Sequence, residues 1–595
     1  MCGICGELRF DGVKPDRDTL GAMMSRLERR GPDAAGQYAD GSVALGHQRL
    51  SIIDLSERSN QPLVDAELGL VLVFNGTIYN YPELREQLAS SGYQFFTGGD
   101  SEVILKAYAQ WGEECPQHLH GMFAFAIWDI RRQTLFMARD RFGIKPLYYS
   151  LTQKYLRFAS TSQALLAAGG LDTGIDPVAL HHHLTLHAVV PAPRTLLRGL
   201  RKLPPAHSMM IHADGSNTVR RYWQLQPVVP ATDMSEWEWI EALHEALIRS
   251  VERRRTIADV PVGILLSGGL DSSLLVALLA EAGGGELHTF SVGFEDQPEE
   301  RGHEFEFSDM VAELYATKHQ RFSIPDSEVL ARLPEAVDNM AEPMVGQDAV
   351  AFYLLGERVS QAVKVVQSGQ GADEVFAGYF WYPQMHAASG SDIERFRDFY
   401  FDRPHGELLE TIDPRYHGPD YTSPRVAHGP AQSGAERFLN RVLSFDVTTL
   451  IVDDPVKRVD NMTMAWGLEA RVPVLDHELV ELAVGVPPEI KLKSGGKHIL
   501  KSVARNLLPD IVIDRPKGYF PVPALKFVRG EVLDFMRGIL ESDACHQRGL
   551  LNRGMVEKLL ASPDQHHTPI LGSKLWHLTL LEFWLQRNVD TIPPP

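Results

Sequence analysis

The sequence predicts an α/β protein whose C-terminal half forms a doubly wound parallel sheet. Two observations support this prediction. From residue 237 onward, short apolar segments typical of buried strands alternate with helical segments, and this alternation indicates parallel strands joined by helices. The first 225 residues instead read mainly as strands and turns. Because the chain has 595 residues, we expect about two to four domains.

The overall composition is that of a globular protein and excludes several functional classes. Hydrophobic residues make up 44%, charged residues 23%, and the net charge is −19, which argues against a general nucleic-acid or membrane surface. No apolar run approaches the roughly 20 residues of a membrane helix, and no signal peptide is recognisable. Four cysteines are too few and too scattered for a disulfide framework, so we expect a cytoplasmic protein. They are Cys2, Cys5, Cys115 and Cys545.

Cys2 directly follows the initiator methionine. Removal of Met1 would leave an α-amino group and a thiol on one residue, and the amine, with a pKa of roughly 7.7–8.0, can serve as the general base. Other interpretations stay open at this point. Cys2-x-x-Cys5 matches a redox pair, a zinc site would need a second cysteine pair, and both cysteines fit a structural N-terminal strand.

Several short motifs follow along the first half of the chain, and each is weak alone. An Asn-Gly pair after a strand is most often a hairpin turn, and an Asp before a helical pattern is most often a cap. We expect a turn, a strand of alternating character, a buried strand leading into Asn-Gly, a helix start and two paired buried strands. These motifs are Arg30-Gly-Pro-Asp33, Arg49–Asp54, Leu70–Phe74 with Asn75-Gly76, Gly98-Gly99-Asp100, and Gly121–Asp129 with Leu135–Asp140.

Together with Cys2, these motifs resemble, in type and order, the class II glutamine amidotransferase domain, which has an N-terminal-nucleophile αββα fold. The resemblance implies that Cys2 is the catalytic nucleophile and attacks the side-chain amide of glutamine. It further implies that the Asn75 side chain and the Gly76 N–H hold the oxyanion, where loss of one donor typically costs about 2.7–4 kcal/mol of barrier. The implied glutamine-binding residues are Arg49, Leu50, Ser51, Ile52, Ile53, Asn75, Gly76, Thr77 and Asp100.

Two of these residues carry charges that suit the two ends of glutamine. Arg49 can grip the α-carboxylate bidentately, and Asp100 suits the α-ammonium group. Thr77 is a departure, because asparagine synthetases commonly carry Glu there. If this position acts through its backbone, little changes; if it acts through a carboxylate, the grip on the ammonium group is weaker here.

A linker is expected over residues 226–236, because its first residues include two prolines and no charged residue. It divides the chain into domains 2–225 and 237–595. The second domain begins with a helix whose Arg253-Arg254-Arg255 end we expect to be solvated. His181-His182-His183 is interpreted as structural, because adjacent positions on a helix point apart.

The second domain is organised around Ser267–Ser273, a turn with two glycines between a buried strand, Val260–Leu266, and a helix from Leu274. The glycine pair lets the backbone approach an anion, and the helix N-terminus favours phosphate. It is not a Walker loop, because no Gly-Lys-Ser/Thr follows. Ligands are expected at the carboxyl ends of the strands. The other expected elements are strands at Leu287–Gly293, His319–Ile324 and Val363–Gly369 and a helix at Phe307–Ala316.

The Ser-Gly-Gly-Leu-Asp-Ser-Ser pattern resembles the pyrophosphate loop of the ATP pyrophosphatase superfamily. With Ala465–Asp476 and Gly496–Leu500, the second domain resembles the synthetase domain of asparagine synthetases. The resemblance implies ATP and Mg²⁺ as cofactors, with Asp271 and Asp373 as metal ligands and Lys497 as a catalytic point charge. The implied ATP-binding residues are Leu265, Leu266, Ser267, Gly268, Gly269, Asp271, Ser272, Val292, Ser368, Gly369 and Lys497.

The acceptor is in question because this chain has Gln370 where asparagine synthetases commonly carry Glu. Gln370 and Glu374 belong to the implied acceptor-activation loop, so the change removes a negative charge there and puts aspartate in doubt. As a whole the chain most resembles N-acetylglutaminylglutamine amidotransferases, through this loop and the His181–Arg194 stretch. Those relatives amidate the terminal carboxylate of a capped osmolyte dipeptide.

The resemblance therefore implies a ligase that uses glutamine and ATP to convert a carboxylic acid into its amide. AMP, pyrophosphate and glutamate would be released, and ammonia would travel inside the protein. Asparagine formation from aspartate is the alternative, and a catalytically silent scaffold protein is a third reading. Arg471 would help to bind the phosphates of ATP. A homodimer is the assembly to be tested. No structure is assigned to residues 382–434.

Overall fold

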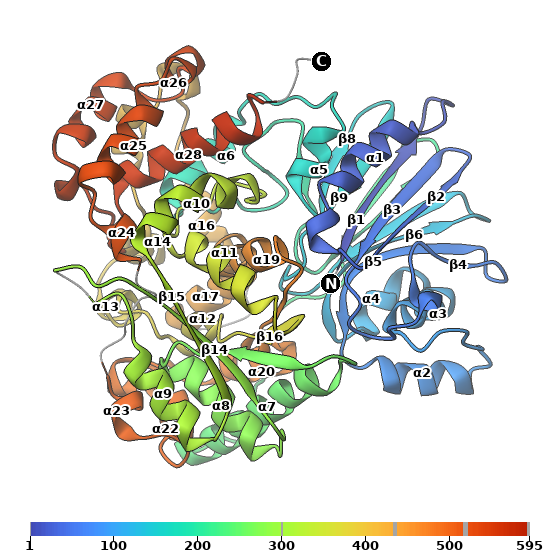
Figure 1. Cartoon of the computed structure of the whole chain (residues 1–595), viewed down its shortest axis with the longest axis horizontal. Coiled ribbons are helices and arrows are strands. Elements are labelled where there is room, and N and C mark those ends of the chain that lie inside the picture. Colours follow the sequence, from blue (N-terminus) through green and yellow to red (C-terminus); the bar gives the residue numbers. More distant parts are fainter. Residues whose placement is uncertain (1, 299–300, 432–436, 516–521, 592–595) are drawn as a thin grey trace.

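The computed structural model describes residues 2–298, 301–431, 437–515 and 522–591. Residues 2–225, here called the N-terminal part, form two antiparallel sheets, and residues 237–591, the C-terminal part, surround a smaller parallel sheet (Figure 1). The first sheet has the order β10(Arg201–Lys202), β8(Tyr148–Leu151), β9(Tyr155–Ala159), β1(Gly3–Arg9), β3(Val43–Arg49), β2(Ala34–Asp40). The second has the order β12(Asn217–Arg221), β11(His207–His212), β7(Thr134–Arg139), β6(Gly121–Asp129), β5(Leu70–Ile78), β4(Leu63–Asp65).

The two antiparallel sheets pack face to face, as strand β5 illustrates. Successive side chains of a strand point to opposite faces. Val71 and Val73 pack in the core between the sheets, whereas Leu72 and Phe74 pack against the helices outside the second sheet. The covering helices are α1(Arg17–Ser25) and α5(Ser162–Ala167) on the first sheet, and α2(Tyr81–Ser90), α3(Asp100–Trp111) and α4(Cys115–His118) on the second. Helix α6(Pro177–Thr185) packs instead against helices of the C-terminal part. The predicted αββα layering is confirmed.

One local expectation in this part is wrong, and one common alternative for a motif does not apply. The strand expected over Arg49–Asp54 is instead β3, which ends at Arg49, and residues 50–54 have no regular structure. The Asn75-Gly76 pair does not make a hairpin turn, because β5 continues through it and both residues pair with β6. In each case tertiary pairing decides the outcome over the local residue preference.

The third sheet has five parallel strands, in agreement with the predicted doubly wound architecture. Helices α7(Glu236–Thr256) and α8(Leu270–Glu281) pack on one face, and α10(Asp326–Asp338) and α11(Asp348–Val359) on the other. The strand order is β15(Lys318–Ile324), β14(His288–Phe294), β13(Val262–Leu265), β16(Val365–Gln367), β17(Glu469–Arg471). Strand β17 was not predicted, because three residues inside a motif carry no periodic signal.

The junction between the two parts also departs from expectation at one residue. Residues 222–235 contain no helix or strand, and α7 begins after a capping box at Ser235. Arg254, expected in solvent, is 3% exposed and donates to Asp476 Oδ2 at 3.0 Å. The end of α7 is therefore packed against the C-terminal part at this residue.

The segment 382–434, which received no sequence-based assignment, consists of short helices joined by loops through residue 431, and 432–434 lie outside the described residues. The remaining helices are α9(Phe305–Leu314), α12(Ala372–Phe376), α13(Trp381–Ala387), α14(Asp392–Tyr400), α15(His405–Thr411), α16(Thr422–Ala431), α17(Phe438–Phe445), α18(Ile451–Asp453), α19(Pro455–Met464), α20(His477–Gly485), α21(Pro488–Lys491), α22(His498–Ala504), α23(Asp510–Ile513), α24(Pro523–Lys526), α25(Gly530–Leu540), α26(Asp543–Arg548), α27(Arg553–Ala561) and α28(Lys574–Asn588).

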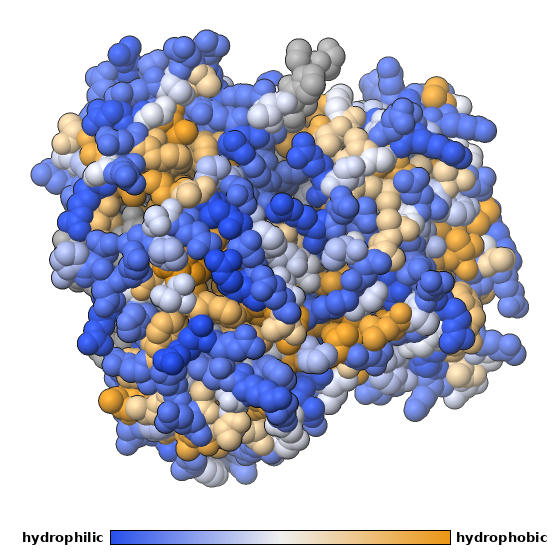
Figure 2. Space-filling model, viewed as in Figure 1, coloured by the Kyte–Doolittle hydropathy of each residue, from blue (hydrophilic) through white to orange (hydrophobic). Residues whose placement is uncertain are grey.

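The surface agrees with the composition. The face seen in Figure 2 is mainly hydrophilic, with apolar residues in separate patches. Among the described residues, no helix has the length and apolar character needed to cross a membrane.

Candidate functional site

Cys2 lies where the two antiparallel sheets meet. It immediately precedes β1, is 7% exposed, and its backbone N–H donates to Asn75 Oδ1 at 3.0 Å. Burial raises the pKa of the Cys2 thiol, while a hydrogen bond from the Leu50 backbone and the charge of Arg49 act in the opposite direction. Met1 lies outside the described residues, so its removal stays a prediction. The structure therefore brings the predicted nucleophile and the predicted oxyanion residue into direct contact.

On strand β5, Asn75 and Gly76 lie next to Cys2. Asn75 is fully buried, and because its Oδ1 accepts from Cys2, its Nδ2 is the remaining amide atom. Within the described part of the chain, Nδ2 is buried without a hydrogen-bond partner, which is costly unless a ligand supplies one. At Gly76 a Cβ would lie 2.1 Å from Met122 O, so only glycine fits. This arrangement suits an oxyanion site.

Arg49 holds the loop that follows β3. Its Nη1 donates to Ser56 O at 2.9 Å and to Asn60 Oδ1 at 2.7 Å, and its Nη2 contacts the carbonyls of Ile53 and Asp54. These contacts shape residues 50–54, which contain four of the predicted glutamine-binding residues. The grip on a carboxylate stays a prediction, since it requires the guanidinium to exchange some of these partners.

The rest of that loop is fixed by burial and by one backbone contact. Leu50 and Ile52 are buried, while Ser51 and Ile53 are partly exposed. The backbone N–H of Ser51 donates to Asp33 Oδ2 at 2.7 Å. Asp33 belongs to the predicted Arg30-Gly-Pro-Asp turn, so two motifs that are distant in sequence are joined beside Cys2.

Asp100 is the first residue of α3, and its side chain contacts the backbone of a neighbouring strand. Its Oδ2 accepts from the Ile78 N–H at 3.0 Å, at the end of the strand that carries Asn75. Burial raises the pKa of Asp100 to about 6, and the charge of Glu469 adds to this rise. A carboxylate of that kind is stabilised by an incoming cation such as the ammonium group of an amino acid.

Thr77 contacts a carboxylate from the C-terminal part of the chain. Its Oγ1 donates to Glu469 Oε1 at 3.3 Å, and Arg471 Nε donates to the same oxygen at 2.6 Å. Glu469 and Arg471 are fully buried in β17. Burial acts against ionisation, yet nearby positive charges, that of Arg471 among them, hold the pKa of Glu469 at about 2.

Glu469 lies within the Ala465–Asp476 motif, and the sequence predicted no role for it. The structure places Glu469 opposite Thr77, across the junction between the two parts of the chain. Position 77 is one at which asparagine synthetases commonly carry Glu. Two further buried ion pairs cross the same junction, from Arg30 at 3.0 Å and from Lys145 at 3.2 Å to Asp460. Charged residues inside an otherwise apolar motif were the signal that could have found it.

Arg471 lies in this junction, which does not fit its predicted role. Its Nη1 donates to the carbonyls of Arg254 at 2.6 Å and Ile257 at 2.9 Å. Because its Nε also donates to Glu469 Oε1, the guanidinium is already hydrogen-bonded to neighbouring protein groups. The expected assistance to phosphates therefore has no support in these contacts.

The second site is built around the Ser267–Ser273 loop, which connects β13 and α8. The helix begins at Leu270, earlier than expected, so Asp271 lies in its first turn. Gly268 has φ +79°, and a Cβ there would lie 2.7 Å from Ser308 N. The loop is closed by a bond from the Gly269 N–H to Ser267 Oγ at 3.2 Å. This is the strand–turn–helix arrangement that suits phosphate.

Lys497 connects this loop to the loop after β16. Its Nζ lies 2.6 Å from Asp271 Oδ2 and 2.7 Å from Asp373 Oδ1. The two carboxylates raise the pKa of Lys497, against the effect of burial. Gly369 approaches from the same side, since a Cβ there would lie 3.0 Å from Asp271 Cβ. Two carboxylates that converge on one cation also fit the donor set that Mg²⁺ takes beside phosphate oxygens.

The other predicted ATP and acceptor residues surround this cluster on the same strands. Leu266 N–H donates to Phe290 O at 2.8 Å, two residues before Val292 on β14. Ser368 N–H donates to Arg471 O at 2.9 Å. These contacts fix the carboxyl ends of the strands beside Ser267 and Gly369. The residues so placed are Leu265, Leu266, Ser272, Val292 and Ser368.

The predicted acceptor residues lie at the start of α12. Gln370 is partly exposed in the loop between β16 and α12, while Glu374 is buried. The hydroxyl of Tyr379 donates to Glu374 Oε1 at 2.8 Å. Both predicted residues are thus within one turn of Asp373.

A thiol beside an amide donor in one part, and a lysine between two aspartates at the ends of parallel strands in the other, define a two-site glutamine amidotransferase. The chain belongs to the asparagine synthase family: the family model described as asparagine synthase matches residues 242–586, and that described as a glutamine amidotransferase domain matches residues 1–223. It is therefore a glutamine- and ATP-dependent amidotransferase ligase of the asparagine synthetase type.

Known relatives match over nearly their whole length. The chain is 31% identical over 635 residues to the glutamine-hydrolyzing asparagine synthetase 1 of Bacillus subtilis, covering 99% of this chain and 97% of that protein. It is 34% identical over 646 residues to a putative asparagine synthetase of Mycobacterium tuberculosis, covering 98% and 97%. A solved glutamine PRPP amidotransferase from B. subtilis aligns with a TM-score of 0.30 and 15% identity over 54% of this chain and 90% of its own, which adds nothing to the family assignment.

Proposed function

We propose that this enzyme amidates the terminal carboxylate of N-acetylglutaminylglutamine. The observation that carries the proposal is Gln370, which stands beside Asp373 and Glu374 where asparagine synthetases commonly carry Glu. Aspartate has an α-ammonium group that a carboxylate would pair with, whereas the amino group of the capped dipeptide is acylated and neutral. A neutral Gln370 therefore suits the dipeptide better. Aspartate, with asparagine as product, is the alternative acceptor.

In the first half-reaction, the Cys2 sulfur attacks the side-chain carbonyl carbon of glutamine. The α-amino group exposed by Met1 removal takes the thiol proton and passes it to the leaving nitrogen, so that ammonia departs and a glutamyl thioester remains. Asn75 Nδ2 and the Gly76 N–H hold the oxyanion. Water then cleaves the thioester to glutamate and restores the thiol. Arg49 and Asp100 hold the α-carboxylate and the α-ammonium group.

In the second half-reaction, an acceptor carboxylate oxygen attacks the α-phosphorus of ATP and pyrophosphate leaves. Ammonia then attacks the activated carbonyl carbon, and AMP leaves as the amide forms. Asp271 and Asp373 would hold Mg²⁺, which supplies positive charge against the phosphates when bound. Lys497, already placed between these carboxylates, would contact the departing pyrophosphate, and the Ser267–Ser273 loop would donate backbone N–H groups to it.

The proposal also covers the domain boundaries, the localisation and the assembly of the enzyme. The glutaminase domain comprises residues 2–225, the linker 226–236 and the amide-forming domain 237–595. The enzyme works in the cytoplasm, where its four cysteines, all free in the structure, would stay reduced. It assembles as a homodimer, which light scattering of the purified full chain tests directly.

The acceptor is tested by offering the purified enzyme ATP, glutamine and an equimolar mixture of N-acetylglutaminylglutamine and aspartate. Mass spectrometry of the products decides between them. The proposal expects the dipeptide amide as the main product, with AMP and pyrophosphate formed in equal amounts. Asparagine as the main product would reject the dipeptide and leave the reaction class intact.

A further inference from the structure

Three segments that are far apart in sequence bring together one histidine of the N-terminal part and an aspartate and a histidine of the C-terminal part. His187 follows α6, Asp402 follows α14, and His577 lies in α28. His187 Nδ1 is 3.4 Å and His577 Nδ1 is 3.2 Å from the same oxygen, Asp402 Oδ2. One ligand atom from each of the three residues lies within 4.8 Å of the other two. Neither catalytic site uses any of these residues.

Ordinary hydrogen bonding does not account for this cluster. Asp402 is completely buried, yet in the described part of the chain neither of its carboxylate oxygens, nor His187 Nδ1, makes a hydrogen bond of normal geometry. A buried carboxylate without partners is strongly unfavourable. The nearest groups to this oxygen are the two ring nitrogens, at 3.2 and 3.4 Å, so its charge is balanced either by a protonated histidine or by a bound cation.

A bound metal ion accounts for both N···O separations. Zinc binds imidazole nitrogen at about 2.0–2.1 Å and carboxylate oxygen at about 2.0–2.2 Å, so two ligand atoms of a tetrahedral site lie roughly 3.3 Å apart. The two observed separations, 3.2 and 3.4 Å, bracket that value. In such a site the metal, and not the neighbouring oxygen, lies along the lone pair of each ring nitrogen.

We propose that His187, Asp402 and His577 form a Zn²⁺ site. The side chains of Asp402 and His577 are 0% and 4% exposed, whereas that of His187 is 16% exposed, so only the side of the site at His187 is open for a fourth ligand such as water. Two neutral imidazoles and one carboxylate are ligands that zinc takes in proteins.

The ionisation states of the three residues are compatible with a bound cation. The two histidines hold the pKa of Asp402 well below its usual value, despite burial. Burial lowers the pKa of His577 to about 4, so its ring is neutral at neutral pH. Burial also acts on His187, but the Asp402 charge outweighs it and raises the pKa of His187.

The neighbouring positive charge has its own partners. Arg403, the next residue in the chain, is buried and its charge contributes to the lowered pKa of His577. Its Nη1 donates to Leu184 O at 3.3 Å and its Nη2 to Lys574 O at 3.0 Å. Arg403 thus connects the same three segments through backbone carbonyls and leaves the Asp402 carboxylate to the histidines.

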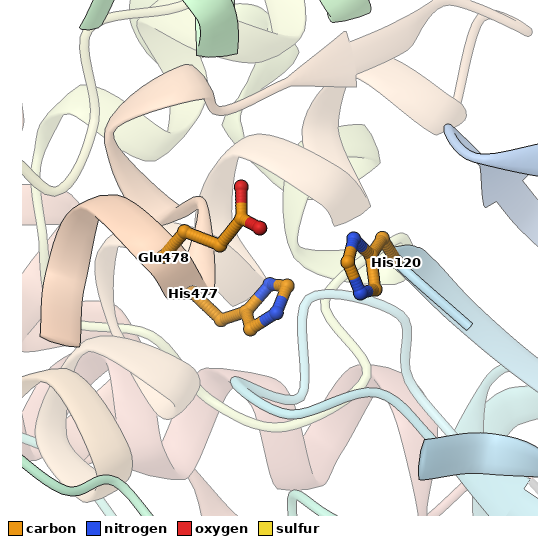
Figure 3. Close-up of side chains that lie close together, drawn as sticks. All are labelled: His120, His477 and Glu478. Carbon is orange, nitrogen blue, oxygen red and sulfur yellow. The ribbon is translucent and has the colours of Figure 1, made fainter. Parts of the chain in front are cut away.

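A second histidine cluster differs in the features that matter. His120, His477 and Glu478 lie at the junction of the two parts (Figure 3), with the His120 and His477 rings 4.6 Å apart. There the Glu478 carboxylate is bound by Arg253 at 2.8 Å, and burial together with the charge of Arg141 lowers the pKa of both histidines. This cluster has a satisfied carboxylate and serves as a comparison.

The proposed metal would join the 382–434 segment to both parts of the chain. Asp402 is the member of the site from that segment, while His187 follows α6 of the N-terminal part and His577 lies in α28 of the C-terminal part. A metal that binds the folded chain alone stabilises it in proportion to its affinity. The site is therefore structural and independent of the acceptor proposed above.

The test uses the full-length enzyme after treatment with a chelator and buffer exchange. Zn²⁺ is added back, bound metal is counted by mass spectrometry, and thermal unfolding is followed with and without it. Co²⁺ in place of Zn²⁺ reports the ligand geometry through its visible absorption. We expect about one ion per chain, a higher Tm with Zn²⁺, and a tetrahedral Co²⁺ spectrum.

Variants connect the signal to the site. D402N and H577Q should each weaken Zn²⁺ binding by at least about tenfold. H182Q is the matched control, because His182 is also buried in α6 and contacts the same segment, through Thr422 Oγ1 at 3.0 Å; H120Q controls for the second cluster. If a buried variant fails to fold, H187Q, at the partly exposed ligand, replaces it. Wild-type binding in D402N or H187Q, or loss of binding in H120Q alone, would overturn the proposal.

Discussion

The hydroxyl of Thr77 lies 3.3 Å from the carboxylate of Glu469, and this contact links the glutamine site to the parallel sheet. Thr77 is two residues beyond Asn75 on β5, whereas Glu469 lies on β17, next to the strand that leads to Asp373. The charge of Glu469 raises the pKa of both Cys2 and Asp100. One buried carboxylate of the synthetase part therefore acts on two residues of the glutaminase part.

Replacement of the nucleophile should separate the two half-reactions. C2A is expected to abolish glutamine hydrolysis and glutamine-dependent amide formation, while amide formation from added ammonium chloride continues. Both rates are measured with the purified enzyme. C5A is the matched control, since Cys5 is buried in β1, three residues after Cys2, and it should keep both activities. Glutamine hydrolysis that survives in C2A would show that another group is the nucleophile.

The oxyanion assignment predicts a loss of turnover more than of binding. N75A removes the buried Nδ2 donor, and we expect kcat of glutamine hydrolysis to fall by about 10²–10³, with a smaller change in KM. The ammonia-dependent reaction should be unaffected. Equal changes in kcat for glutamine and for ammonia would instead indicate a general loss of structure.

The raised pKa of Asp100 predicts how glutamine binding depends on pH. Only the ionised carboxylate attracts the α-ammonium group, so KM for glutamine should rise as pH falls through about 6. E469Q removes a negative charge that raises this pKa, and the rise in KM should therefore move to lower pH. A pH profile of KM that is the same in wild type and E469Q would contradict the link between the two residues.

The carboxylates at Lys497 predict the behaviour of the synthetase site. D271N should reduce acceptor-dependent release of pyrophosphate by at least about tenfold, because it removes one of two negative charges proposed to hold Mg²⁺. Raising the Mg²⁺ concentration should recover part of this loss. D309N, at an exposed ion pair with Arg321, is the control. Unchanged release in D271N would remove Asp271 from the site.

The acceptor proposal predicts a change of preference from a single substitution. Q370E restores the carboxylate that asparagine synthetases commonly carry, so kcat/KM for aspartate should rise relative to that for the capped dipeptide. The ratio is obtained from both acceptors in one mixture. A ratio that stays the same would place acceptor choice elsewhere.

Much of the architecture was predictable from the sequence, because it follows from periodic patterns. The continuous apolar run of β5 and the strand–turn–helix around Ser267 each have a local signal. The β3 boundary at Arg49 and the three-residue strand β17 have no local signal, because pairing with strands remote in sequence defines them. The local pattern also led to a wrong expectation for Arg254, whose partner Asp476 is the N-cap residue of α20.

The residues of the two candidate sites were likewise predictable only where a local motif contains them. Cys2, Asn75 and Asp100 could be named from motifs, and the structure brings them together. Glu469 escaped a role because its significance depends on a contact across the junction with Thr77. The His187–Asp402–His577 cluster had no sequence signal, since its members are separated by more than a hundred residues and share no spacing rule.

The central claim is that ammonia released at Cys2 is consumed at the second site without mixing with solvent. It is tested most directly with glutamine labelled with ¹⁵N in its side-chain amide, in the presence of excess unlabelled ammonium. Mass spectrometry of the amide product gives the fraction of label. The account predicts that nearly all product nitrogen is ¹⁵N in the wild type and none is in C2A. Wild-type product with the isotope ratio of the free ammonium pool would contradict it.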